Sequence, residues 1–188
     1  MRALSNSRRH LRVPVSDTVP STGTVRISVV WQMPKVMREF GVDLGEVLEA
    51  AGVRKDIFDD RENQIPYPAF GRLLFECEKR SNCDHIVLLI SQHTRLADLG
   101  LAGQIALCAE SAGDGLQRFV EHFNLHSSAT TAGLVTSGHF TRFVYAIAVQ
   151  GMTSTRQLQL GAMVIAYNIL RDLFGSAWLP TVITIASR

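Results

Sequence analysis

The chain folds around two glycine-containing segments, Leu99-Gly100-Leu101-Ala102-Gly103 and Ser111-Ala112-Gly113-Asp114-Gly115-Leu116. Asp98 is a suitable N-cap for a helix that begins at the first segment, and Gly100 and Gly103 allow two backbones to approach closely. Gly113 and Gly115 predict unusual backbone dihedrals between this helix and the next one. The two segments therefore predict a corner at which two helices pack together.

Apolar residues at helical spacing flank this corner on both sides. Leu116, Phe119, Val120 and Phe123 form a stripe that follows it. Similar stripes precede the corner and predict helices near residues 36–40, 44–51, 68–80 and 86–90. Asp43 is a suitable N-cap for the second of these helices, and Gly52 ends it. The N-terminal half is therefore predicted to be helical.

Beyond the corner the residue pattern changes from helical to strand-like. Residues 130–136 and 140–149 are rich in β-branched and aromatic residues and flank Ser137-Gly138, which predicts a β-hairpin. In its second strand Tyr145 shares one face with Phe143, Ile147 and Val149, whereas Arg142 points to the other face.

Three further segments complete the predicted secondary structure. Residues 155–174 predict a long helix, residues 181–186 a further strand, and alternation over residues 25–31 a short strand. The fold class is therefore α+β: a helical N-terminal half followed by a β-hairpin, a long helix and a further strand.

Composition excludes several classes of protein. With 46% hydrophobic residues in 188, the chain can bury a core, but no apolar run reaches the roughly 18 residues that a membrane-spanning helix needs. The three cysteines form no CxxC pair, which favours a reducing, cytoplasmic compartment. We therefore expect a cytoplasmic protein with no membrane association.

Charge is distributed unevenly along the chain. Five of the 19 basic residues but only one of the 17 acidic residues precede Val30, so 14 basic and 16 acidic residues remain after it. Such a slightly acidic body lacks the basic face that DNA binding requires. Residues 1–23 mix Arg, Ser, Pro and Thr without periodicity and are predicted to be a disordered leader, with the folded domain spanning residues 24–188.

No catalytic or metal-binding motif stands out. The sequence contains no nucleophile elbow, no phosphate-binding loop and no dinucleotide-binding glycine motif, and Ser111 with Asp114 and His126 reads as cap and turn residues rather than as a triad. His122 and His126 have the i, i+4 spacing of a helical metal site, but a third ligand is not evident. We expect a non-enzyme without cofactor or metal.

The order of elements and several short motifs resemble the N-terminal, arabinose-binding-like sensor domain of AraC-type transcriptional regulators. The resemblance spans residues 33–185. It rests on matching apolar and glycine positions: Ala50-Ala51-Gly52-Val53, Ile65-Pro66 leading to Phe70 and Leu73-Leu74, Leu99-Gly100-Leu101 with Gly103, and Gly115-Leu116 before Phe119.

The resemblance implies a ligand-sensing, homodimeric domain that reaches DNA only through an attached pair of helix-turn-helix units. This sequence contains no such pair, so we expect the sensor domain to be truncated at its C-terminal end, as a fragment or as a truncated gene product. The resemblance also implies a small-molecule effector. Nothing in the sequence favours a sugar over an acid or a lipid.

For such a sensor, the pocket is expected between the hairpin and its covering helices. We predict Phe123, His126, Arg142 and Tyr145 as ligand-binding residues, with Arg142 available to pair with a carboxylate if it faces inward. The alternative hypothesis is a ligand-independent dimerisation module or a truncated remnant. The apolar residues on several faces of helix 155–174 fit either deep burial or an interface.

Overall fold

The computed structural model describes residues 23–147, 149 and 155–185. Of the leader expected over residues 1–23, all but Gly23 lies outside the described residues. The described part contains seven α-helices: α1 (Met33–Glu39), α2 (Leu44–Ala51), α3 (Tyr67–Ser81), α4 (Ile86–Ser91), α5 (Gly100–Leu107), α6 (Ala112–Glu121) and α7 (Arg156–Phe174). Its four strands are β1 (Thr24–Arg26), β2 (Gln64–Pro66), β3 (Thr130–Ser137) and β4 (Phe140–Ile147). Short 3-10 helices are η1 (Ile27–Val30), η2 (Lys55–Phe58), η3 (Leu96–Leu99) and η4 (Phe123–Leu125).

The strand predicted over residues 25–31 is shorter than expected. Only β1 is extended, and it pairs antiparallel with β2 so that Val25 faces Ile65. Ile27–Val30 turns into η1, in which all four side chains are buried. Alternation places every second side chain on an exposed face, and a segment surrounded by core on all sides has no such face.

The helical N-terminal half forms as predicted. Asp43 Oδ1 accepts hydrogen bonds from the backbone N–H of Gly45 at 2.6 Å and Glu46 at 3.3 Å, which caps α2. Gly52 ends this helix with a φ of 66°, in the left-handed region that glycine tolerates. The predicted apolar stripe of α3, including Phe70 and Leu73, is buried.

The glycine corner exists, but two details of its prediction are wrong. Gly113 and Gly115 do not have unusual dihedrals, because both lie within α6. Asp98 does not cap α5; it lies inside η3, where its Oδ2 accepts a hydrogen bond from the backbone N–H of Arg95 at 2.9 Å. Close packing accounts for the need for glycine at Gly103, where an added Cβ would lie 1.9 Å from the carbonyl oxygen of Leu96.

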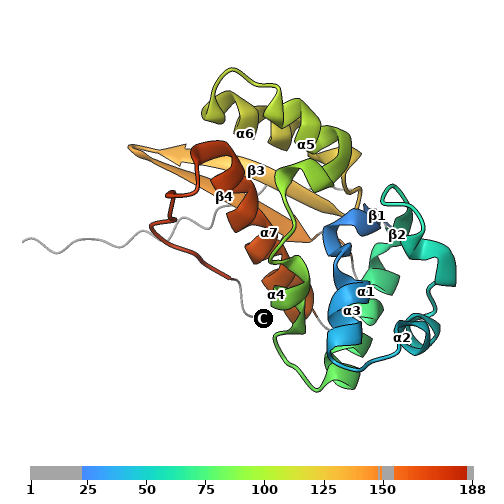
Figure 1. Cartoon of the computed structure of the whole chain (residues 1–188). Helices are drawn as coiled ribbons and strands as arrows, with labels where there is room; N and C mark the ends of the chain where they lie inside the picture. The colour runs from blue at the N-terminus through green and yellow to red at the C-terminus, as the bar shows by residue number, and fades with distance from the viewer. Residues whose placement is uncertain (1–22, 148, 150–154, 186–188) are drawn as a thin grey trace, which may run out of the picture.

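The hairpin β3–β4 and helix α7 form the second half of the molecule. The strands pair antiparallel, with Leu134 opposite Phe143, and Gly138 takes a φ of 59° in the turn. Helix α7 crosses the hairpin and runs beside α4, with α5 and α6 at one end and α1 to α3 at the other (Figure 1). The apolar face of β4 packs against the core, as predicted, although its side chains are only half-buried.

The further strand predicted at residues 181–186 is not formed in its described part, residues 181–185. A strand needs a hydrogen-bonded neighbour, and the described residues supply none for this segment. Its side chains are exposed instead, with Val182 at 77%. The molecule nevertheless mixes helices with two small antiparallel sheets, so the predicted α+β class is confirmed.

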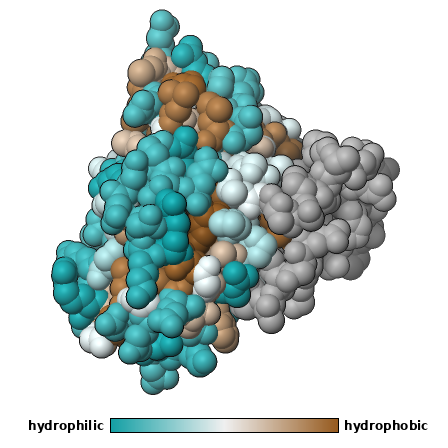
Figure 2. Space-filling model, turned by 90° about the vertical axis from the view of Figure 1, so that its right-hand side faces the viewer, coloured by the Kyte–Doolittle hydropathy of each residue, from teal (hydrophilic) through white to brown (hydrophobic). Residues whose placement is uncertain are grey.

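Hydrophilic residues make up most of the coloured surface in Figure 2, and apolar residues reach it in patches. Within the described residues, no helix is both long and apolar enough to cross a membrane.

Candidate functional site

A cavity of about 60 Å³ lies where the two halves of the molecule meet. Its walls come from β1, η1, α3, α4, η3, α6, η4, the hairpin and α7. Most of its lining is apolar. A single water molecule needs only about 10–15 Å³, so this space is larger than a packing defect.

Small side chains on α7 keep this space open. Gly161, Ala162 and Ala166 lie on the cavity side of the helix. An added Cβ at Gly161 would lie 2.9 Å from Val87 Cγ2 and 3.5 Å from Ser91 Oγ on α4. The glycine therefore lets α7 approach α4 closely, while the neighbouring alanines leave room in the cavity.

Aromatic rings form one wall of the cavity. The Phe123 ring centroid lies 5.4 Å from that of Phe119, 5.6 Å from that of His126 and 6.2 Å from that of Tyr145, all in edge-on arrangements. Such contacts favour a rigid arrangement of the rings. Three of the four predicted ligand-binding residues, Phe123, His126 and Tyr145, are therefore brought together here.

Two phenol groups meet inside the cavity. The hydroxyl oxygens of Tyr67 and Tyr145 are 2.9 Å apart, so one hydroxyl donates a hydrogen bond to the other. Burial is the main cause that raises the pKa of both residues, and the proximity of Tyr145 raises the pKa of Tyr67 further. Both hydroxyls therefore remain neutral at physiological pH.

His126 carries an unpaired polar atom in this interior. The side chain is 7% exposed, and its Nδ1 is buried without a hydrogen-bond partner. Burial lowers its pKa from 6.5 to about 3, and the positive charge of nearby Arg26 contributes to the same direction. The imidazole is therefore neutral at physiological pH and retains an unused hydrogen-bonding position.

Ser91 is a second polar residue without a partner. It lies at the end of α4, is fully buried, and its Oγ makes no hydrogen bond. It lines the cavity together with His126. Sequence reasoning missed Ser91, since a serine at the end of an apolar helix has no distinctive pattern, and it missed Tyr67, which lies between two prolines.

The chain matches the model of a family described as the arabinose-binding domain of AraC transcription regulator, N-terminal, over residues 41–187. The chain belongs to this family. The resemblance inferred from the sequence is therefore confirmed, and the family is a sensing domain of regulators rather than an enzyme class. No curated protein matches the chain. The matched range of this AraC-type domain includes every cavity wall except β1 and η1.

Arg142 is the predicted ligand-binding residue that the fold does not bring to the cavity. It lies opposite Val135 in the hairpin and is exposed, whereas its neighbour Phe143 lines the cavity. The alternation of a strand explains this placement, because adjacent side chains point to opposite faces. A carboxylate in the cavity could not pair with Arg142 in this arrangement.

The two histidines considered for metal binding are separated by a change of backbone. Helix α6 ends at Glu121, and η4 follows, so His122 and His126 do not share one helical face. The Nδ1 of His122 lies 2.9 Å from the carbonyl oxygen of Arg118. The described residues contain no group of three or more His, Cys, Asp or Glu residues that could hold a metal ion.

Ser111 and Asp114 form a helix cap, as the sequence indicates. Ser111 Oγ accepts a hydrogen bond from the backbone N–H of Asp114 at 3.1 Å and donates one to its carboxylate at 2.8 Å. Both groups are thus used at the start of α6, where a capping hydroxyl is favourable.

Proposed function

We propose that this domain binds a small-molecule effector in the cavity between the hairpin and α7, and that effector binding controls transcription through an attached DNA-binding domain. In this role the domain acts in the cytoplasm. The observation that carries the proposal is the unpaired, buried Nδ1 of His126 inside an aromatic wall. Buried polar atoms are nearly always hydrogen-bonded, so an unpaired one on a residue that lines a cavity is a reason to expect a ligand there.

Helix α7 offers a physical route for the signal. One side of it lines the cavity through Leu158, Ile165 and Ile169. On the segment that joins α4 to η3, the Asn168 amide donates to the carbonyl oxygens of Ser91, Gln92 and Thr94 at 3.3, 3.1 and 3.0 Å. An occupant that presses on α7 would therefore act on the α4–η3 segment as well.

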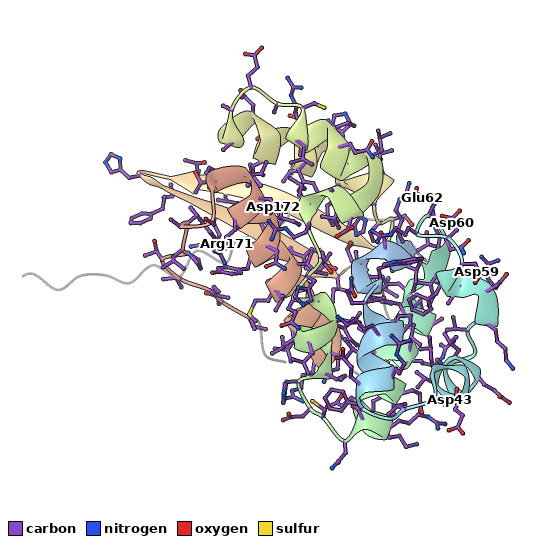
Figure 3. All side chains as sticks on the ribbon, in the orientation of Figure 1. Asp43, Asp59, Asp60, Glu62, Arg171 and Asp172 are labelled. Atoms are coloured by element: carbon purple, nitrogen blue, oxygen red, sulfur yellow. The ribbon has the colours of Figure 1, made fainter. Side chains whose placement is uncertain are left out.

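A second anchor fixes α7 to the same segment. Asp172 lies next to Arg171 near the end of α7 (Figure 3). The carboxylate of Asp172 accepts hydrogen bonds from the backbone N–H of Leu96 at 2.8 Å and from Nε of Arg95 at 3.2 Å. Two anchored positions on a single helix favour movement of α7 as a rigid unit with η3, rather than local fraying.

Hydrogen exchange tests this proposal. The chain is compared with and without each member of a panel of bacterial metabolites that includes sugars, organic acids, fatty acids and small aromatic compounds. A bound effector should slow exchange in residues 156–174 and 123–147 because its contacts restrict their opening. Protection confined to other segments would contradict the placement of the site.

Dimerisation is the second function that an observation favours. Apolar side chains are exposed along residues 174–185, among them Phe174 at 43%, Leu179 at 72% and Val182 at 77%. Such surfaces are typical of protein interfaces. Sedimentation with and without the metabolite panel separates the two functions, because a dimer that no ligand shifts favours an interaction module and a ligand-shifted equilibrium favours a sensor.

A further inference from the structure

We infer that the effector is a small, neutral, largely apolar molecule with one or two hydrogen-bonding groups, and is neither a sugar nor a carboxylate. This inference rests on the proposed function and specifies its ligand. It follows from three properties of the cavity: its charge, its free hydrogen-bonding positions and its size.

The lining provides no charge to pair with an ionised ligand. Among the described residues around the cavity, none carries a carboxylate, ammonium or guanidinium group. The nearby cation Arg26 forms an ion pair with Glu62 and donates from Nε to the carbonyl oxygen of Leu125 at 3.3 Å. Burial of an unpaired charge is strongly unfavourable, so an acid or amine would have to bind in its neutral form.

Most polar atoms around the cavity already have partners. Ser127 Oγ donates to the carbonyl oxygen of Thr24 at 3.2 Å and accepts from the hydroxyl of Thr130 at 2.9 Å. The hydroxyls of Tyr67 and Tyr145 bond to each other.

Among the fully buried side-chain atoms of the described lining residues, His126 Nδ1 and Ser91 Oγ have no hydrogen-bond partner. A pentose carries several hydroxyl groups and a ring oxygen, and most of them would be buried without partners here. Each such group costs on the order of 1–3 kcal/mol.

The small size and aromatic walls of the cavity favour a compact apolar group. Its volume of about 60 Å³ lies beside Phe119, Phe123 and Phe143, whose faces and edges provide apolar contacts. An apolar cavity of about 150 Å³ holds benzene, so an aromatic ring enters this smaller space only if the hairpin or α7 moves outward. A ring that carries one hydroxyl could reach His126 Nδ1 while its body contacts the phenylalanines.

Phenol and toluene test the inference directly, since the two differ by a hydroxyl in place of a methyl group. Each is titrated into the full chain and followed by backbone amide NMR shifts, with L-arabinose and benzoate titrated in parallel. We expect phenol and toluene to shift the resonances of residues around the cavity and phenol to bind about tenfold more tightly, as one hydrogen bond provides. L-arabinose and benzoate should leave these resonances unchanged.

Three variants locate the hydrogen bond. His126→Phe keeps a ring but removes Nδ1, so the preference for phenol over toluene should disappear. Ser91→Ala removes a hydroxyl without a partner, so the fold is retained. The phenol affinity of this variant should fall by about threefold or stay the same, and its toluene affinity should not change. Arg142→Ala, outside the cavity, should preserve both affinities.

The outcomes separate the inference from the proposed function. Tighter binding of L-arabinose or benzoate than of phenol at cavity residues would overturn the inference and leave the proposed effector site intact. An unchanged phenol preference in both the His126→Phe and Ser91→Ala variants would also overturn it. If none of the four probes shifts the resonances of cavity residues, the inference is wrong. The proposed function fails as well only if no member of the metabolite panel slows hydrogen exchange at these residues.

Discussion

The helical half of the molecule is packed more tightly than the half formed by the hairpin and α7. In the described residues, the largest fully buried side chains all lie between Ile27 and Phe119. By contrast, the core-facing side chains of β4 are half-buried, and Leu158 and Ile169 are the large apolar residues of α7 that are buried. Densely packed interiors are only slightly compressible, so the helical half is expected to be the more rigid of the two, and under the proposed function the second half is the part that responds.

The cavity lies at the boundary between these two regions. Its rigid walls come from α3 and α4, and its other walls come from the hairpin and α7. A ligand that fills it would give the loosely packed half contacts that the empty cavity cannot supply. The difference in packing thus accounts for both the position of the site and the element that would carry its signal.

The largest expected effect lies in the tightly packed half. Gly103→Ala should lower the free energy of unfolding by about 3 kcal/mol or more, because the added Cβ would lie 1.9 Å from the Leu96 carbonyl oxygen. Gly113→Ala is the matched control: its Cβ would meet only Ser111 Oγ at 3.9 Å, and alanine favours helix by up to about 1 kcal/mol. Urea denaturation measures both. Equal effects of the two substitutions would show that the corner is not tightly packed.

The next largest effect is a pH dependence of the free energy of unfolding, which arises at His126 on the boundary between the two regions. His126 has a pKa of about 3 in the folded chain and an ordinary value of 6.5, so between these pH values the unfolded chain binds a proton that the folded chain does not. The free energy of unfolding should therefore fall as pH decreases below 6.5, by about 1 kcal/mol per pH unit. Arg26 is the charged neighbour that strengthens the effect, while the phenols of Tyr67 and Tyr145 remain neutral.

Variants at His126 assign this pH dependence. His126→Phe and His126→Gln cannot be protonated at this site, so their stability curves should lose that slope between pH 6 and 4, with urea denaturation as the measurement. A slope equal to that of the original chain in both variants would mean that His126 is protonated in the folded state.

A smaller effect is expected from the tyrosine pair that joins the two regions. Tyr145→Phe or Tyr67→Phe leaves one buried hydroxyl without its 2.9 Å partner, which should cost about 1–2 kcal/mol. The double variant removes both hydroxyls, so its cost should be lower than the sum of the single costs by about 1 kcal/mol. Thermal unfolding of the four chains gives the coupling energy, and a value of zero would break the proposed link between α3 and β4.

The smallest effect concerns the outer face of the hairpin. Arg142 is exposed and lies outside the cavity, so Arg142→Ala should change the free energy of unfolding by less than about 0.5 kcal/mol. A marked loss of stability would instead show that Arg142 is part of the packed structure. The two regions would then differ less in how tightly they are packed.

Much of the fold was predictable because local signals and tertiary packing agree. Asp43 and Gly52 bound α2 as their capping chemistry indicates, and the alternation of β4 correctly separates Tyr145 from Arg142. The predictions fail where the tertiary surroundings of a segment decide its secondary structure. Ile27–Val30 alternates in sequence like a strand but is surrounded by core, and residues 181–185 have strand composition but no strand beside them.

The candidate site was only partly predictable for the same reason. Phe123, His126 and Tyr145 belong to apolar periodic patterns, so their inward orientation could be inferred. Ser91 has no such pattern, because what makes it notable is the absence of a partner, a property of its surroundings.

The sequence by itself determined the helices, the hairpin, the family and the inward-facing aromatic residues, since these depend on periodicity, capping and residue order. Only the tertiary structure decided that a space remains beside those residues, that His126 Nδ1 and Ser91 Oγ have no partners there, and that no described residue lines the space with a charged side chain. The physical reason is that a cavity is set by how closely separate elements approach. At Gly161 that approach depends on contacts between residues about seventy positions apart.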